Sequence, residues 1–322
     1  MALWRIQMSA IQRERLFSLY AQNLETLKLR GAFSTVPDIT DFFLCPLCLR
    51  LFLRSELDEQ DLSLDHVPPQ SVGGTKCTLT CTSCNNEAGK TLDSALKRKL
   101  AIEDFQAGIL GARLDVRFSP GEDIWLPAKA HRHQPGGLIL EDFLNPKRSH
   151  PDDRQHAQEL LATGVPDVQI QHLQPGWRRI DVALLRIAYL YAFSVLGYGL
   201  ILNPIIQKVR EQVNKPEKHI LPGRWMLPVK SPPPSTISLN VVRMPEYLQS
   251  FLVIFELVSP NRMRRPFAVI LPFPGASGLE IYSRFEEAMR IGNLKSLLLA
   301  HVPEATEYLI DPTSCFIAGE GL

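Results

Sequence analysis

Two Cys-x-x-Cys pairs constrain this chain more than any other feature of its sequence. One pair is Cys45 with Cys48, and the other is Cys81 with Cys84. Two residues between thiolates let a short loop turn back, so that both sulfurs can reach one tetrahedral Zn²⁺ ion at about 2.3 Å. Because four thiolates leave no open coordination position, the pattern predicts a zinc ion that supports the structure and does not itself catalyse.

The alternatives for these cysteines are a redox motif or pairs of unrelated reduced thiols. Two pairs at ligand spacing seldom coincide by accident. The first thirty residues contain no uninterrupted apolar run of the kind found in secretory signals, and disulfides are uncommon in the cytoplasm. We therefore expect zinc, a cytoplasmic location, and ordinary apolar roles for Cys77 and Cys315.

The segment between the two pairs is longer than the roughly 15 to 20 residues that separate the pairs of a simple zinc ribbon. Leu62-Ser-Leu64 predicts a short strand, and the Asp65-His66 pair follows at its end. Pro68-Pro69 must end this strand, because proline has no N–H to donate to a sheet. After Gly73-Gly74, the residues from Lys76 to Thr80 predict a returning strand.

A helix is predicted from Asn86 onward, directly after the second cysteine pair. Apolar residues fall on one face of it and charged residues mostly on the other, namely Ala88, Leu92, Ala95, Leu96 and Leu100 against Lys90, Asp93, Lys97 and Arg98. The zinc turn would fix the start of this helix, so Asn85 can project toward the Asp65-His66 hairpin. A carboxylate and an amide oxygen suit Mg²⁺ or Mn²⁺ better than zinc.

These motifs in this order resemble those of the zinc-framed HNH endonucleases, which have the ββα-metal, or His-Me finger, fold. The resemblance covers about residues 41–100. It implies that Asp65 and Asn85 bind a catalytic Mg²⁺ or Mn²⁺ ion and that His66 is the general base that activates the attacking water. It also implies a nucleic-acid substrate, with DNA expected, and products that carry a 5′-phosphate and a 3′-hydroxyl.

One position departs from the family pattern. Many members have an asparagine nine residues before the position of Asn85, where it helps to orient the catalytic histidine, but this chain has Lys76 there. A backbone carbonyl could take over that contact.

Simpler interpretations stand beside each of these assignments. Asn85 could only cap the helix, Asp65 could be a surface turn residue, and His66 could be a hydrogen-bonded core histidine. Lys90, Lys97 and Arg98 are candidates for phosphate contacts, although the run from Lys97 to Lys99 is also typical of a solvated helix face. The competing function is a catalytically silent zinc module in a nucleic-acid-binding or scaffold protein.

The rest of the chain favours an α+β fold. We expect an N-terminal helical segment at 1–34, the zinc-containing nuclease domain at 35–105, and an α+β domain at 106–322. The last domain is expected to choose the target or to bind a partner, either another protein or a second copy of the chain. Helices are predicted at 8–30, 180–196 and 278–291, strands at 112–118, 236–242, 251–258 and 267–271, and a proline-rich crossing at 214–235.

Charge excludes one further class of protein, and hydropathy argues against a membrane protein, which is a third and weaker hypothesis. The 322 residues include 35 Lys and Arg against 34 Asp and Glu, a net charge of +1, which excludes a polycationic coat around nucleic acid. The uncharged stretch 187–207 is about long enough to span a bilayer, but Gly197-Tyr-Gly199 and Pro204 interrupt it. We therefore predict a buried helix followed by a turn, and no membrane partner.

Overall fold

The computed structural model describes residues 2–31, 39–57, 61–119, 125–133, 137–142, 144–162, 169–171, 176–229, 237–273, 278–292, 294 and 296–303. Contacts between residues divide the chain into two units. The first unit consists of Met1–Ser94, Trp177–Leu257 and Arg264–Leu322, and the second of Ala95–Gly176 and Val258–Met263. The boundaries expected at residues 34 and 105 divide the chain by role and remain a prediction.

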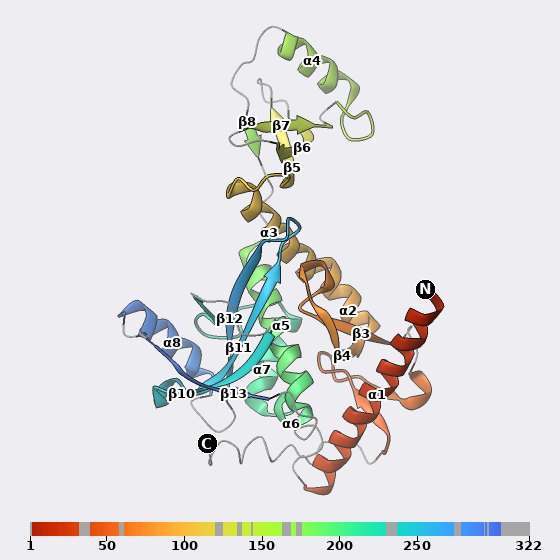
Figure 1. The fold of residues 1–322 in the computed structure, drawn as a ribbon, viewed down its shortest axis with the longest axis vertical. Coiled ribbons are helices and arrows are strands. Elements are labelled where there is room, and N and C mark those ends of the chain that lie inside the picture. The colour runs from red at the N-terminus through yellow and green to blue at the C-terminus, as the bar shows by residue number, and fades with distance from the viewer. Residues whose placement is uncertain are drawn as a thin grey trace. The chain divides into compact units, whose positions relative to one another are not determined.

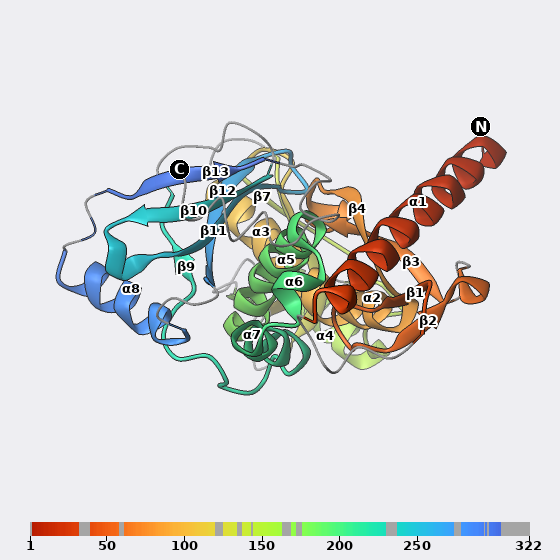
Figure 2. The same cartoon turned by 90° about the horizontal axis from the view of Figure 1, so that it is seen from below.

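The first unit begins with helix α1 (Ala2–Leu29), where the sequence predicts a helix. Its buried side chains recur every three or four residues and include Phe17, Tyr20, Leu24 and Leu27. This face packs on strand β1 (Phe42–Leu44) and on a β-hairpin, as Figure 2 shows. The Tyr20 hydroxyl shares a hydrogen bond of 2.9 Å with the Thr78 hydroxyl, so the helix is fixed against the hairpin.

The hairpin consists of the antiparallel strands β3 (Leu62–Val67) and β4 (Thr75–Cys81). β3 ends directly before Pro68, as predicted. The connecting loop contains the short 3₁₀ helix η2 (Gln70–Val72). Gly74 is required in this loop, because a Cβ atom there would lie 1.4 Å from the carbonyl oxygen of Pro68.

A nearly continuous helical stretch follows the hairpin. It consists of α2 (Thr82–Ala88), a π-helical turn η3 (Gly89–Asp93) and α3 (Ser94–Gln106). The five apolar residues predicted on its inner face, from Ala88 to Leu100, are all buried. Asp93 differs from the expectation, because the Asp93 side chain is only 17% exposed. The π-helical turn holds one more residue than an α-helical turn and so changes the direction in which later side chains point.

The first cysteine pair lies between two short strands. β1 pairs antiparallel with β2 (Leu51–Leu53), and Cys45 and Cys48 occupy the turn between them. A 3₁₀ helix η1 (Arg54–Glu56) follows β2. In it, Arg54 donates two hydrogen bonds to the Asp41 carboxylate, at 2.6 and 2.7 Å, which ties the end of β2 to the start of β1.

Three helices form the centre of the first unit. They are α5 (Trp177–Leu196), α6 (Tyr198–Ile201) and α7 (Pro204–Asn214). α5 is buried on nearly all sides, and Gly197, at a φ of +64°, ends it. Asn203 caps α7 by accepting a hydrogen bond from the N–H of Ile205 at 3.0 Å. The predicted buried helix followed by a turn is confirmed. Among the residues the structure describes, no helix is both long and apolar enough to cross a bilayer.

A five-stranded sheet completes the first unit and lies beside α5 and α7 (Figure 1). Its strand order is β13-β10-β11-β12-β9, with β9 (Met226–Leu227), β10 (Ile237–Met244), β11 (Ser250–Val258), β12 (Arg264–Pro272) and β13 (Leu298–Val302). A short 3₁₀ helix η4 (Glu246–Leu248) and helix α8 (Glu280–Arg290) accompany it. The three strands and the last helix predicted in this region are confirmed. The described part of the predicted crossing, 214–229, is irregular apart from the end of α7 and β9.

The second unit contains a four-stranded sheet with the order β7-β6-β5-β8. The strands are β5 (Arg113–Ser119), β6 (Leu126–Arg132), β7 (Leu138–Glu141) and β8 (Gln169–Gln171), and helix α4 (Pro151–Ala162) precedes β8. Its core includes Ile102 of α3 and the inward residues Leu114, Val116 and Phe118 of β5. The strand predicted at 112–118 is confirmed, whereas Cys315 lies outside the described residues.

Candidate zinc site and active site

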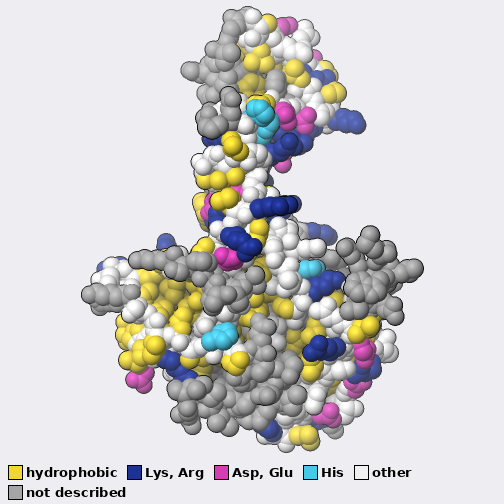
Figure 3. Space-filling model, in the orientation of Figure 1, with side chains coloured by type: hydrophobic (Ala, Val, Ile, Leu, Met, Phe, Trp, Pro, Cys, Tyr) yellow, Lys and Arg dark blue, Asp and Glu magenta, His cyan; other side chains and the backbone are white. Residues whose placement is uncertain are grey.

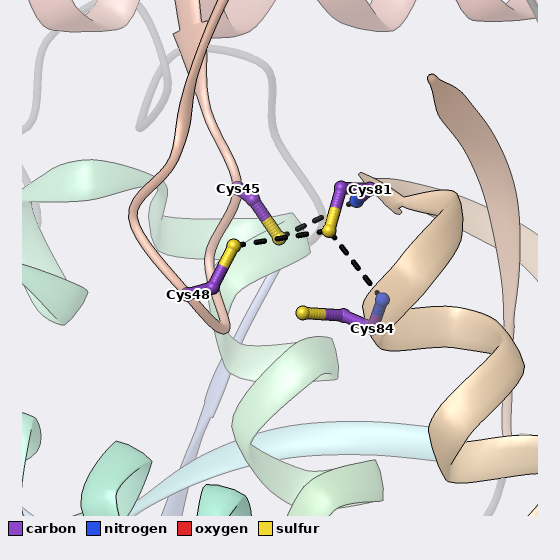
Figure 4. A group of neighbouring side chains, drawn as sticks. All are labelled: Cys45, Cys48, Cys81 and Cys84. Carbon is purple, nitrogen blue, oxygen red and sulfur yellow. Dashed lines mark hydrogen bonds between the residues drawn. The ribbon is translucent and has the colours of Figure 1, made fainter. Parts of the chain in front are cut away.

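The four cysteines of the two Cys-x-x-Cys pairs converge. Their sulfur atoms all lie within 4.8 Å of one another, and Figure 4 shows them pointing to a common centre from the β1–β2 turn and from the start of α2. Cys48 Sγ and Cys81 Sγ are 3.7 Å apart. Four sulfurs at about 2.3 Å from a tetrahedral zinc ion lie about 3.8 Å from one another, so the cluster has the dimensions of a zinc site.

The surroundings of the cluster act differently on its four thiols. Hydrogen bonding with Cys45 lowers the pKa of Cys81 to about 7 and also lowers the pKa of Cys48. Hydrogen bonding within the cluster raises the pKa of the other two thiols, with Cys48 as the largest cause for Cys45 and Cys45 as the largest cause for Cys84. Backbone N–H groups of Cys81 and Cys84 donate to the sulfurs of Cys45 and Cys81, at 3.3 and 3.4 Å. The donor set of four sulfurs and no oxygen is typical of structural zinc.

The helices α5, α6 and α7 form hydrogen bonds with the backbone around the first cysteine pair. The Tyr189 hydroxyl donates to the carbonyl of Pro46 at 2.6 Å, and the Asn214 amide donates to the carbonyl of Leu47 at 2.7 Å. Tyr198 bonds to both backbone groups of Leu44, at 2.9 and 2.6 Å. The zinc module is therefore packed on a helical scaffold that lies far away in the sequence.

Asp65 lies inside the protein and not in a surface turn. It is only 3% exposed. The Thr80 hydroxyl donates to its Oδ2 at 3.1 Å, and Arg186 of α5 donates to the same oxygen at 2.5 Å. Since Asp65 is buried and both contacts use Oδ2, the carboxylate is held in one orientation, with Oδ1 as its other oxygen.

His66 follows at an irregular point of the hairpin. Asp65 pairs with Thr78 but His66 pairs with Lys76, so Cys77 is an extra residue on β4 and forms a β-bulge. Successive side chains of a regular strand point to opposite faces, and a bulge can re-aim one of them. Burial lowers the pKa of His66 below its ordinary value of 6.5, and the charge of Lys76 lowers it further, while Asp65 acts in the opposite direction. The imidazole is therefore neutral near pH 7.

Lys76 takes a defined place beside the histidine. Its ammonium group donates to Ser9 at 3.0 Å and its carbonyl accepts from Gln12 at 3.1 Å, both on α1. The residue that stands in place of the usual asparagine therefore links the hairpin to α1 and acts on His66 through its charge.

Asn85 is oriented toward the same strand as Asp65. Its Nδ2 donates to the Ser63 hydroxyl at 3.0 Å. Ser63 and Asp65 are two residues apart on β3 and so share one face of the strand. The helix cap is provided by Cys81, whose sulfur accepts from Cys84 N, and not by Asn85. Asn85 is thus bonded across to the hairpin, and its carbonyl oxygen is not consumed by this bond.

Two residues of this region were missed by the sequence reasoning. Arg186 is 1% exposed, and its Nη1 lies 3.8 Å from the Asp93 carboxylate. Burial raises the pKa of Asp93 to about 6, while Arg186 lowers it and Asp65 raises it. The signal for Arg186 was present, because it is the only charged residue between Asp181 and Lys208. A lone charge in an apolar run requires a buried partner.

The three candidate phosphate-binding residues lie on the helical stretch after the zinc turn. Lys90 in η3 and Lys97 in α3 are exposed, and Arg98 is half-buried. On the face shown in Figure 3, Lys and Arg side chains of the described residues are scattered and do not merge into one basic patch. This agrees with the near-zero net charge of the chain.

The hairpin, the zinc turn and the helix together form a ββα-metal module inside a mixed α and β protein. Residues 45–101 match the family model described as HNH endonuclease. The chain therefore contains an HNH endonuclease domain, as the resemblance predicted. No curated protein and no solved structure matches the chain.

Proposed function

We propose that this protein is a metal-dependent endonuclease that hydrolyses phosphodiester bonds in nucleic acid, with DNA as the expected substrate. In this proposal His66 is the general base, and Asp65 and Asn85 hold one Mg²⁺ or Mn²⁺ ion. The observation that carries it is the Asn85–Ser63 hydrogen bond within the HNH domain, because it directs the amide to the strand face that bears Asp65.

The donor set fits a hard divalent cation. Asp65 keeps Oδ1 after Oδ2 has bonded to Thr80 and Arg186, and Asn85 keeps its carbonyl oxygen after Nδ2 has bonded to Ser63. One carboxylate oxygen and one amide oxygen, with water and phosphate oxygens in the remaining positions, suit Mg²⁺ or Mn²⁺. When bound, such an ion would offset negative charge on the phosphate and on the departing oxygen.

The remaining chemistry belongs to His66. A neutral imidazole nitrogen accepts the proton of the water that attacks the phosphorus, in line with the departing 3′ oxygen. The lowered pKa of His66 serves this role, because the imidazole then stays unprotonated at neutral pH. Lys90, Lys97 and Arg98 are proposed to contact backbone phosphates, which would not depend on base sequence. Residues 106–322 are proposed to recognise the target or a partner, and the cytoplasm remains the expected location.

The second candidate function is a zinc-containing scaffold or nucleic-acid-binding protein without cleavage. Its support is the burial of Asp65 in an ion pair with Arg186, which would also be expected of a purely structural carboxylate. Cleavage distinguishes the two functions, because a silent module can bind nucleic acid but cannot break its backbone.

The test compares two adjacent asparagines of α2. We expect the purified wild-type protein to cut labelled DNA when Mg²⁺ or Mn²⁺ is added and not in metal-free buffer. Asn85→Ala should lower the rate by about 10–100-fold or more, because it removes an oxygen that orients the cation. Asn86→Ala is the matched control, since Asn86 is the next residue of α2 and its side chain is exposed. Parallel assays with RNA identify the substrate.

Binding of DNA without any metal-dependent cutting would support the scaffold instead. Equal rates for Asn85→Ala and Asn86→Ala would remove Asn85 from the proposed site, even if the wild-type protein cuts.

A separate expectation concerns pH. Lys76→Gln removes a positive charge that disfavours protonated His66, so it should raise the pKa of His66. Cleavage that needs neutral His66 falls as the pH drops through this pKa, so the acid limb of kcat/KM should move to higher pH in Lys76→Gln. Lys76→Arg keeps the charge and should keep the wild-type profile. Identical acid limbs for Lys76→Gln and wild type, measured from about pH 5 to 8, would contradict this role of Lys76.

A further inference from the structure

Arg186 is the one charged side chain in the buried part of helix α5. Its neighbours on the helix, from Val182 to Leu190, are buried apolar residues and Tyr189. Moving a guanidinium group from water into such surroundings is unfavourable unless it is paired and hydrogen-bonded. The position of Arg186 therefore has to be explained by what its head group contacts.

The head group contacts the HNH domain. Nη2 donates to Asp65 Oδ2 at 2.5 Å, and the side chains of Arg186 and Asp65 are 2% and 4% exposed. Nη1 lies 3.8 Å from Asp93 Oδ1, on the π-helical turn. One guanidinium group thus connects the strand that bears Asp65 with the helical stretch that follows Asn85, and it does so from a residue 121 positions away from Asp65 in the chain.

Arg186 contacts only one of the two carboxylate oxygens of Asp65, namely Oδ2. Thr80 also donates to Oδ2 of Asp65, at 3.1 Å, so two donors from two elements fix the same oxygen. A carboxylate held in this way cannot rotate without breaking both bonds. Its other oxygen, Oδ1, therefore keeps a fixed direction.

We infer that Arg186 is a positioning residue for Asp65: it holds the carboxylate oriented so that Oδ1 is presented to the catalytic cation. This inference rests on the proposed nuclease function. Arg186 is too buried to touch the substrate and acts through Asp65 alone. It follows that the active site extends beyond the matched segment 45–101, because α5 supplies one of its components.

Arginine is better suited to this task than lysine. The planar guanidinium group carries several donors in a fixed geometry and reaches both carboxylates at once, whereas an ammonium group is a single point of charge on a flexible stem. Asp93 supports this arrangement. Its carboxylate pairs with Nη1 of Arg186 and so restricts rotation of the guanidinium group.

The first measurement is cleavage by the full-length, zinc-loaded protein. Arg186→Met should lower kcat about 10–100-fold, the usual effect of removing a partner of a metal ligand, and should leave KM for the nucleic acid within about threefold. Arg186→Lys keeps the charge and should recover part of the loss. Arg179→Met is the matched control on the same helix, because Arg179 is half exposed and pairs with Glu217.

The inference makes a stronger prediction for the double variant. If Arg186 acts through Asp65, then Arg186→Met should cost nothing further once Asp65→Asn is present. Losses that multiply in the double variant would show that Arg186 acts on the reaction by another route and would overturn the inference. A loss confined to KM would overturn it too.

The second measurement does not involve activity. Thermal unfolding is followed for the wild type, Asp65→Asn, Arg186→Met and the double variant, each with zinc bound and without Mg²⁺ or Mn²⁺. Asp65→Asn alone should lower the midpoint by about 5 °C or more, because it removes the nearer of the two carboxylates that pair with the buried Arg186. In the Arg186→Met background the same change should raise the midpoint, since it removes an uncompensated carboxylate.

The two measurements separate the possible failures. If Asp65→Asn lowers the midpoint both in the wild type and in Arg186→Met, Arg186 does not hold Asp65. Coupled midpoints with wild-type cleavage by Arg186→Met would make the ion pair purely structural and refute the inference. Absence of cleavage by the wild-type protein would refute the proposed function and with it the catalytic part of the inference. The unfolding data would then still show whether Arg186 fixes Asp65. If Arg186→Met does not fold, Arg186→Lys carries the comparison.

Discussion

Replacing His66 with alanine is expected to lower the rate of nucleic-acid cleavage by about 10²–10⁴-fold, the usual effect of losing a general base. The reason is chemical, because no other group named in the proposed site can accept the proton of the attacking water at neutral pH. Asp65 is engaged with Arg186 and Thr80, and Asn85 does not titrate. The measurement is the rate of cutting of labelled DNA with saturating Mg²⁺ or Mn²⁺.

The fold should survive this change. His66 is only partly buried and is not among the four cysteines of the zinc cluster, so zinc content and the thermal midpoint should stay near wild type. His301→Ala is a suitable control, since His301 is exposed on β13. A His66→Ala protein that cuts at the wild-type rate would show that another group is the base, while the HNH fold itself would be unaffected.

Loss of the zinc ion is expected to unfold the hairpin and the start of the helix together. Structural zinc sites bind with an apparent free energy of about 10–16 kcal/mol near pH 7, which is comparable to the whole stability of a domain. Cys45 and Cys48 come from one turn and Cys81 and Cys84 from another, so the ion joins segments that are otherwise separate. Cys81→Ser should therefore abolish zinc binding, cleavage and most of the thermal stability of this module.

The matched control is Cys77→Ser, because Cys77 lies on the same strand but outside the cluster. Elemental analysis should find about one zinc per chain in the wild type and in Cys77→Ser, and none in Cys81→Ser. Acid should release the ion, since thiolates must be deprotonated to bind it. A wild-type protein that contains no zinc, yet melts and cuts as before, would refute the structural role.

Local sequence patterns predicted the module well, for identifiable reasons. The two cysteine pairs fix which turns meet, Pro68 ends β3 because it lacks an N–H, and the apolar spacing from Ala88 to Leu100 selects the buried face of the helix. Each of these signals acts within a few residues. The Asp65, His66 and Asn85 roles were reached through the family resemblance, and they remain proposals.

Contacts between distant segments were not predictable in the same way. The sequence predicts a buried helix at 180–196, but nothing local says that its one arginine will meet Asp65, or that Tyr189 and Tyr198 will bond to the backbone of the first cysteine turn. The inward turn of Asp93 depends on the π-helical turn, which the apolar periodicity does not reveal.

The sequence by itself determined the presence of a hairpin and a helix joined by a four-cysteine cluster, because the cysteines and the turn residues that build them are close neighbours in the chain. Only the tertiary structure decided how Asp65 is held, since its partner Arg186 arrives from a helix more than a hundred residues later. Burial is what joins the two: a charge inside an apolar helix is stable only beside an opposite charge, and the folded chain places that charge on the strand of the proposed active site.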